Sequence, residues 1–186
     1  MLTSEQIQQS EQFTEEYGAG RDHTDWRGHT YKNVYLDDYA IYPDKFVVAV
    51  LDTMYDWESQ TSNAGYREAP QYFRINPRNF TGKRLYKLVG KNKLLVTDAC
   101  RELVSNPNQH GTPDPNWLLD NLHTLNKLRP IDILLVCGKV AQKTFDKLKV
   151  DEDCFLRNVK ILRIPHPAAR TWTKEAIRKV YEEINA

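Results

Sequence analysis

Two stretches near the C-terminal end decide the fold of this chain: Leu134-Leu-Val-Cys-Gly-Lys-Val-Ala-Gln-Lys143 and Leu162-Arg-Ile-Pro-His-Pro-Ala-Ala-Arg170. Each is an apolar run that stops abruptly at small or polar residues. In an open α/β sheet, a buried strand that delivers a glycine or a histidine to its carboxyl end commonly builds a binding site. The two stretches therefore predict buried strands with functional residues at their carboxyl ends.

The same alternation of strands and helices extends over most of the chain. Apolar runs predict strands at Lys45–Leu51, Lys93–Thr97, Ile131–Val136 and Val159–Ile164. Amphipathic patterns predict helices at Thr81–Val89, Asn116–Lys127, Val140–Leu148 and Lys174–Asn185. Strands that alternate with helices form parallel sheets with helices on both faces. We expect an α/β fold, a three-layer αβα sandwich around a central, mainly parallel four-stranded sheet.

The chain has 186 residues, which is enough for one domain with a substantial core, and we expect a single domain over 1–186. Residues 1–44 form an N-terminal extension of different character. A polar helix is predicted at Thr3–Tyr17, and the residues from Arg21 to Asp44 are loop-rich, with no clean periodicity.

The net charge of +1 provides no strong global field, but its distribution is uneven. Residues 1–60 hold 12 Asp and Glu against 4 Lys and Arg, whereas Arg67–Lys93 holds 8 basic residues and one acid, Glu68. A basic face of this kind suits a polyanion bound on one side. On charge alone, a solvated charged surface is the better interpretation.

The three cysteines, Cys100, Cys137 and Cys154, have no spacing typical of a metal site. An odd number of cysteines and the absence of an export signal favour reduced thiols and a cytoplasmic location. Cys137 lies in an apolar run and is expected to pack in the core. No apolar stretch is long enough to cross a bilayer, so no membrane association is expected.

The two C-terminal stretches resemble the uracil-DNA glycosylase superfamily. In that family one strand ends in Gly-x-x-Ala-Gln-Lys and a later strand ends in His-Pro-Ser or a close variant, which here reads His166-Pro-Ala168. The resemblance covers roughly residues 45–182. It implies a monofunctional DNA N-glycosylase that acts on DNA as a monomer, needs no metal or organic cofactor, and leaves an abasic site.

The resemblance also implies two catalytic residues. Without gaps, Lys45–Asp52 aligns with the family's first motif and places Asp52 on its catalytic aspartate. A carboxylate there stabilises the oxocarbenium-like sugar and orients the attacking water. Val50-Leu51 and Thr53-Met54 depart from that motif, so Asp56, a purely structural Asp52, or no catalytic aspartate remain alternatives.

His166 aligns with the histidine that hydrogen-bonds the base O2 as negative charge develops there, a contact worth roughly 3–4 kcal/mol. Pro167, Ala168 and Arg170 would then contact DNA, although the family's bulky apolar wedge is missing from this loop. Gly138 is expected to allow either close packing or the approach of a phosphate to the N-terminus of the following helix. A structural histidine at a strand end is the alternative interpretation.

Four further residues are candidates for binding the base. Phe73 aligns with the aromatic residue on which the flipped base stacks, with core packing as the alternative and Tyr72 as its neighbour. Asp98 stands where uracil-specific members have an asparagine, and a carboxyl suits the N4 amine and N3 of cytosine better. Met54 replaces a tyrosine that crowds the base C5, so a C5 substituent fits unless Tyr55 restores the block.

These changes predict a C5-modified cytosine, such as hydroxymethyl- or glucosyl-hydroxymethylcytosine in phage DNA, and a resemblance to bacterial anti-phage glycosylases. The segment Asp22–His29 is interpreted as a surface loop with a packed Trp26. Two alternatives remain: Trp26 could stack on a sugar, or the aspartate and histidine residues of the segment could bind a metal. Three rival functions remain: a catalytically silent module that binds DNA or a protein, a uracil-DNA glycosylase, and an enzyme of free nucleosides or nucleotides.

Overall fold

The structure is a computed structural model, and it describes residues 23–24, 30–31, 45–55, 69, 71–75, 79–105, 109–152 and 154–186. A four-stranded sheet with the order β4-β3-β5-β6 forms its centre, and every neighbouring pair is parallel. The strands are β3 (Phe46–Leu51), β4 (Lys93–Asp98), β5 (Ile133–Cys137) and β6 (Lys160–Ile164). Two short strands, β1 (His23–Thr24) and β2 (Thr30–Tyr31), pair antiparallel as a separate ribbon.

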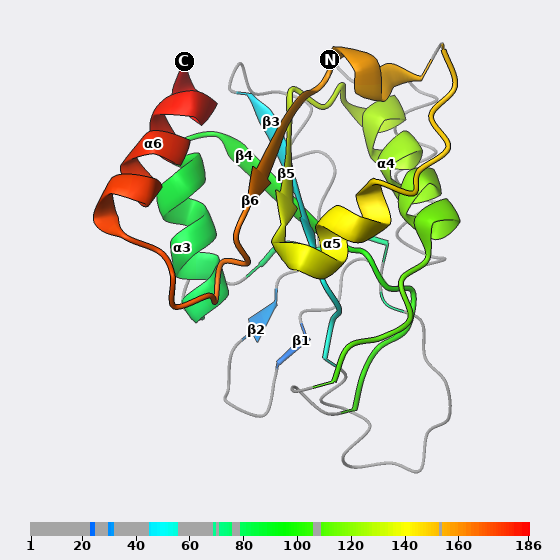
Figure 1. Ribbon diagram of the computed structural model, residues 1–186, viewed down its shortest axis with the longest axis horizontal. Helices are drawn as coiled ribbons and strands as arrows, with labels where there is room; N and C mark the ends of the chain where they lie inside the picture. The colour runs from blue at the N-terminus through cyan, green and yellow to red at the C-terminus, as the bar shows by residue number, and fades with distance from the viewer. Residues whose placement is uncertain are drawn as a thin grey trace.

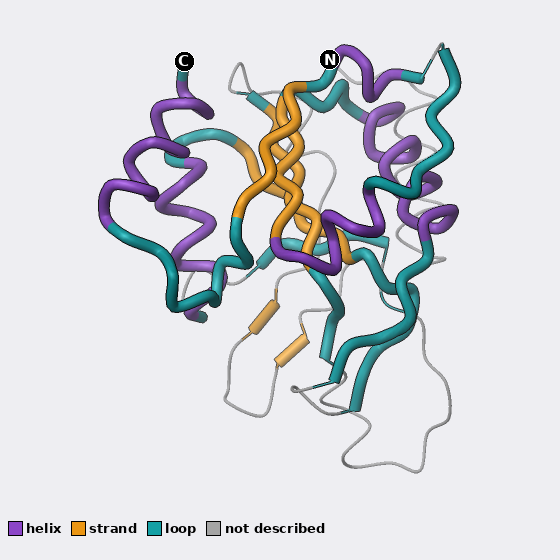
Figure 2. The backbone as a smooth tube through the Cα atoms, viewed as in Figure 1, coloured by secondary structure: helices purple, strands orange, loops and turns teal. Residues whose placement is uncertain are grey.

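Helices cover both faces of the sheet, which confirms the predicted three-layer αβα architecture (Figures 1 and 2). One face packs against α3 (Phe80–Val89) and α6 (Lys174–Asn185), and the other against α4 (Pro115–Leu128) and α5 (Gly138–Phe145). A short 3-10 helix, η1 (Phe155–Asn158), precedes β6. Among the described residues, no helix is long and apolar enough to cross a membrane.

The boundaries lie within two residues of the predicted ones, except for the end of the helix predicted at Val140–Leu148, and two of the shifts at element starts have local causes. The helix predicted at Val140–Leu148 begins at Gly138 and ends at Phe145, because β5 runs into it without an intervening loop. Strand β5 begins at Ile133, because the side chain of the preceding residue, Asp132, accepts a hydrogen bond from Phe46 N through Oδ2 at 2.6 Å. The helix predicted at Thr3–Tyr17 lies outside the described residues.

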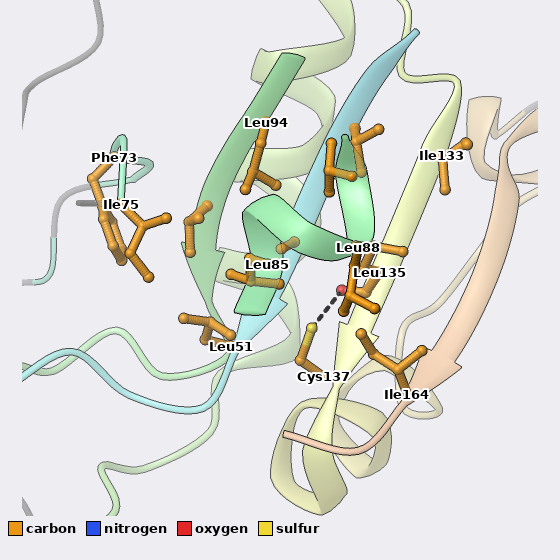
Figure 3. Close-up of a cluster of buried hydrophobic side chains, with 14 of the residues drawn as sticks. Leu51, Phe73, Ile75, Leu85, Leu88, Leu94, Ile133, Leu135, Cys137 and Ile164 are labelled. Carbon is orange, nitrogen blue, oxygen red and sulfur yellow. Dashed lines mark hydrogen bonds between the residues drawn. The ribbon is translucent and has the colours of Figure 1, made fainter. Parts of the chain in front are cut away.

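The core follows from the alternation of β3 between the two faces of the sheet. Val48 and Val50 point into the cluster under α4 and α5, whereas Val47 and Ala49 point into the cluster under α3 and α6. Figure 3 shows the second cluster, in which the Sγ of Cys137 lies 3.4 Å from the carbonyl oxygen of Leu135. Burial raises the pKa of the Cys137 thiol, as suits a residue that packs in the core.

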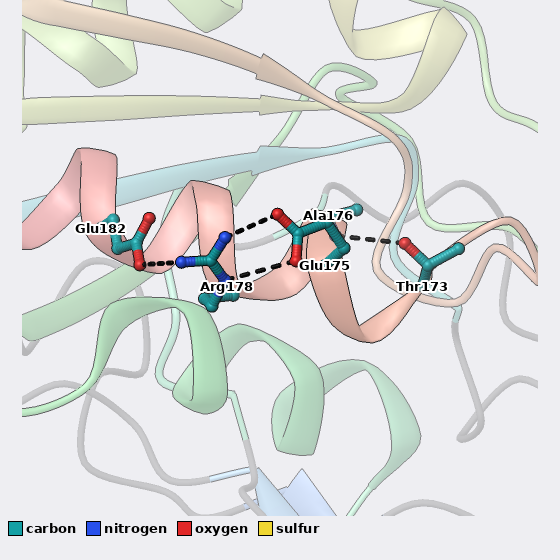
Figure 4. Close-up of polar contacts among 5 residues, drawn as sticks. All are labelled: Thr173, Glu175, Ala176, Arg178 and Glu182. Carbon is teal, nitrogen blue, oxygen red and sulfur yellow. Dashed lines mark hydrogen bonds and ion pairs between the residues drawn. The ribbon is translucent and has the colours of Figure 1, made fainter.

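Helix α6 is supported by a side-chain cap and by ion pairs along its exposed side. Thr173 caps α6 by accepting a hydrogen bond from Ala176 N at 3.1 Å, and Arg178 bonds Glu175 and Glu182 along its exposed side (Figure 4). Such exposed pairs contribute little stability individually. Together α3 and α6 hold the segment between β6 and α6 in place.

Candidate active site at the carboxyl edge of the sheet

The carboxyl ends of the four strands bring together the residues that the sequence singled out. Asp52 follows β3, Asp98 ends β4, Gly138 follows β5, and His166 lies just beyond β6. Leu51 pairs with Asp98 in the register of β3 and β4, so the two carboxyl groups stand on adjacent strand ends. The charge of Asp52 raises the pKa of Asp98 and opposes the lowering of the pKa of His166, as expected of one shared site.

Asp98 is a buried carboxyl group for which the described residues supply no hydrogen-bond partner. Its side chain is 1% exposed, and neither of its oxygens is bonded. Burial, together with the nearby charge of Asp52, raises the pKa of Asp98 from 3.8 to about 8. The group is therefore mostly protonated at neutral pH, with one donor and one acceptor. A buried polar group left in this way is costly and indicates a ligand site.

Asp52 is paired with a histidine that the sequence did not point to. His110 Nδ1 lies 2.6 Å from Asp52 Oδ2, whereas Asp52 Oδ1 is buried and has no hydrogen-bond partner among the described residues. Gly111 N donates to Thr53 Oγ1 at 3.0 Å, which holds the segment carrying His110 against the end of β3. One carboxylate oxygen is thus oriented by a histidine and the other remains available.

His166 presents a neutral imidazole to the site. Ala168 N donates to His166 Nδ1 at 3.1 Å, so the proton of the neutral ring resides on Nε2. Burial lowers the pKa of His166, and the neighbouring His110 lowers it further. The ring is therefore a neutral hydrogen-bond donor through Nε2, which suits a contact with an atom that gains negative charge.

The two sequence stretches that resemble the glycosylase family are joined by direct contacts. Gln142 Nε2 donates to Val136 O at 3.3 Å and to Ile164 O at 3.0 Å, which links the ends of β5 and β6. Gly138 has φ +88°, and a Cβ there would lie 3.0 Å from the Cβ of His166. Only glycine fits this backbone conformation and this close approach without strain.

The loop after His166 is held from the α3 side. Arg84 Nη1 donates to Pro167 O at 2.6 Å and to Ala169 O at 2.9 Å. Trp172 Nε1 donates to His166 O at 3.0 Å. Pro167 is buried, in contrast to the DNA contact predicted for it, and Ala168 and Arg170 are exposed.

The predicted base-binding residues lie on the face of the sheet that α3 and α6 cover. Phe73 pairs with Val96 through backbone bonds of 2.8 and 2.9 Å, and its ring is packed in the core there together with Met54. Asp98 points to the same face as Val96, two residues earlier in β4. Tyr55 is only partly buried. Core packing accounts for Phe73 in this structure, and stacking of a base on its ring remains a prediction.

Gln71 is a second residue that sequence reasoning missed. Its carbonyl oxygen accepts hydrogen bonds from Thr97 Oγ1 at 2.6 Å and from Asn121 Nδ2 at 3.2 Å, which fixes it beside the end of β4. Gln71 Oε1 is buried without a hydrogen-bond partner among the described residues. Its only sequence signal was its place two residues before Phe73.

Two of the sequence predictions cannot be placed. Asp56, the alternative catalytic carboxylate, and most of Asp22–His29, including Trp26, lie outside the described residues. Within the part of the chain that the structure describes, no group of three or more His, Cys, Asp or Glu is arranged to hold a metal ion. Neither a scan against protein-family models nor a search of curated proteins found a match to the chain.

Proposed function

We propose that this protein is a DNA glycosylase of the uracil-DNA glycosylase superfamily that removes a cytosine-type base modified at C5 and leaves an abasic site. One observation carries the proposal. His166, whose Nδ1 accepts a hydrogen bond from Ala168 N, and Asp52, which has one unbonded oxygen, converge at one sheet edge beside the buried Asp98, whose two oxygens have no hydrogen-bond partner among the described residues. These are the groups that cleavage of an N-glycosidic bond requires.

In the proposed reaction the bond between C1′ of the sugar and N1 of the base breaks, and its electron pair leaves with the base. His166 Nε2–H hydrogen-bonds the base O2, where negative charge accumulates. The Asp52 carboxylate stabilises the positive charge on the sugar, and its unbonded Oδ1 accepts a hydrogen bond from the attacking water. The water oxygen bonds to C1′, and its proton passes to Asp52.

His110 acts in this scheme as a positioning residue, because it is bonded to Asp52 rather than placed at the reacting atoms. With Oδ2 engaged by His110, the orientation of the carboxylate is restricted, and Oδ1 is left without a hydrogen-bond partner among the described residues. Preorganisation of this kind is the main source of electrostatic catalysis.

Asp98 is the proposed reader of the base. Its protonated carboxyl can donate to N3 and accept from the N4 amine of a cytosine-type base. The protonated carboxyl also matches uracil, because its O–H can donate to O4 and its other oxygen can accept from N3–H. Uracil is therefore a second candidate as long as Asp98 holds its proton. Met54, which is buried in the core cluster on the same face of the sheet, is slender and adaptable, which favours a base with a C5 substituent.

The first test is abasic-site formation on matched duplex and single-stranded DNAs that contain uracil, cytosine, 5-hydroxymethylcytosine or its glucosylated form. We expect release of a C5-modified cytosine by the wild-type protein. Release of uracil alone would instead select the second candidate. DNA binding without release of any base would support a catalytically silent binding module, and cleavage of free nucleosides that is insensitive to salt would indicate the nucleoside enzyme.

Asp98→Asn should shift the preference from cytosine-type bases towards uracil. The ionised carboxylate can only accept hydrogen bonds and repels uracil O4, whereas the amide always keeps a donor. The shift should be larger at pH about 9 than at pH about 6, because Asp98 loses its proton near pH 8. The measurement is the ratio of excision rates for the two bases at both pH values. An unchanged ratio in a folded variant would remove Asp98 as the reader.

A further inference from the structure

Phe80 is an exposed aromatic residue at the carboxyl edge of the sheet, outside the proposed base pocket. It is the first residue of α3, and its side chain is 60% exposed. Helix α3 leads into the start of β4, so its first turn lies at the edge where the strands end (Figure 1). Asn79 fixes this end of the helix by accepting a hydrogen bond from Gly82 N at 2.5 Å.

Arg84 joins Phe80 to the loop that follows His166. The Arg84 guanidinium carbon lies 4.6 Å from the centre of the Phe80 ring and 5.9 Å from that of Trp172. The same guanidinium donates to the carbonyl oxygens of Pro167 and Ala169. Arg84 therefore links Phe80 to the loop after His166, although the two come from different elements.

The surroundings of Phe80 suit a nucleic acid. The first turn of α3 contains no acidic residue, Lys83 and Lys87 are exposed on the same helix, and Arg170 is exposed on the neighbouring loop. A single rigid aromatic ring among cations matches a nucleobase beside phosphates. A docking site for another protein would instead present a contiguous apolar patch.

We propose that Phe80 enters the base stack of duplex DNA at the position vacated by the extruded nucleotide. The proposal rests on the proposed function, since an enzyme that extrudes a base leaves a gap between the flanking base pairs. Inserted apolar side chains stabilise unstacked steps in other DNA-binding proteins. The exposed residues of the loop after His166, Ala168, Arg170 and Thr171, include no bulky apolar side chain, and Trp172 is engaged by its hydrogen bond to His166 O, so the aromatic ring comes from α3.

The test is the affinity of the protein for DNA that already contains a stable abasic-site analogue, measured on duplex and on single strand. Phe80→Ala should weaken duplex binding about 10- to 100-fold, in line with the loss of one stacking contact. It should leave single-strand binding nearly unchanged, because a single strand has no gap to fill. Phe80→Trp should retain duplex affinity.

Tyr181→Ala is the matched control, since Tyr181 is an exposed aromatic on α6 beside Gly90, at the opposite end of α3. It should change neither affinity. An equal loss on both DNAs, or no loss on duplex, would overturn the role of Phe80. Because the ligand is already abasic, these outcomes do not depend on excision. Failure of the glycosylase proposal would appear separately, as absence of base release by the wild-type protein.

Discussion

His166→Ala should slow base excision by about 100- to 1000-fold while leaving DNA affinity almost unchanged, because removing one preoriented donor to a developing oxyanion costs about 3–4 kcal/mol in the transition state. Single-turnover excision at saturating enzyme separates this loss from any change in binding. The effect belongs in the chemical step, since the charge on O2 is largest in the transition state.

The protonation state of His166 adds a second readout. Burial lowers the pKa of His166, so the neutral donor form persists below the ordinary histidine pKa of 6.5. The part of the excision rate that His166 supplies should therefore fall at a lower pH than it would with an ordinary histidine. A rate that rises as the ring becomes protonated would indicate an imidazolium donor instead.

His123→Gln is the matched control for this substitution. His123 lies on α4, where its ring packs edge-to-face on Phe155 at 5.1 Å, away from the strand ends. Its replacement should leave the excision rate unchanged. If His166→Ala kept the wild-type rate, the donor would have to be another group, and the role given to His166 would be wrong.

The fold was largely predictable because the signals that determine it are local. Residues Phe46–Leu51 are all buried, and a continuous apolar run is what a central parallel strand requires. Thr173 begins α6 with a side-chain cap, and Gly90 ends α3 with φ 67°. Helix start and stop signals of this kind can be recognised in a sequence without knowledge of the segments that pack against the helix.

Half of the candidate site could be predicted for a topological reason. Asp52, Asp98 and Gly138 lie at the ends of buried strands and His166 lies just beyond the partly exposed edge strand β6, and the carboxyl ends of parallel strands meet at one edge. The contacts of His110 and Gln71 could not be predicted in this way. Each lies in a segment without periodicity, and its partner is set by packing between parts of the chain that are distant in sequence.

Arg84 shows the same limit on a helix. Its side chain is partly buried on α3. Its bonds to Pro167 and Ala169 depend on where α3 lies relative to the loop after β6. That relation arises only once both segments are packed against the same sheet.

The stability of the protein should fall as the pH rises from about 4 to about 8, and Asp98→Asn should remove most of that fall. The pKa of Asp98 is about 8 in the folded protein, against 3.8 as its ordinary value. Between these values the folded state retains a proton that the unfolded state has released, so the free energy of unfolding decreases with pH. At about 1.4 kcal/mol for each pKa unit, the decrease amounts to several kcal/mol.

Urea unfolding of both proteins at pH about 5 and about 9 measures this difference, and the expected result is that Asp98→Asn is the more stable protein at the higher pH. Asp52→Asn should have a smaller effect in the same direction, since the charge of Asp52 is the lesser cause of the raised pKa. Parallel pH profiles for wild type and Asp98→Asn would mean that Asp98 is already ionised in the folded state. In that case the carboxyl could not donate to N3, and only its acceptor role towards the N4 amine would survive.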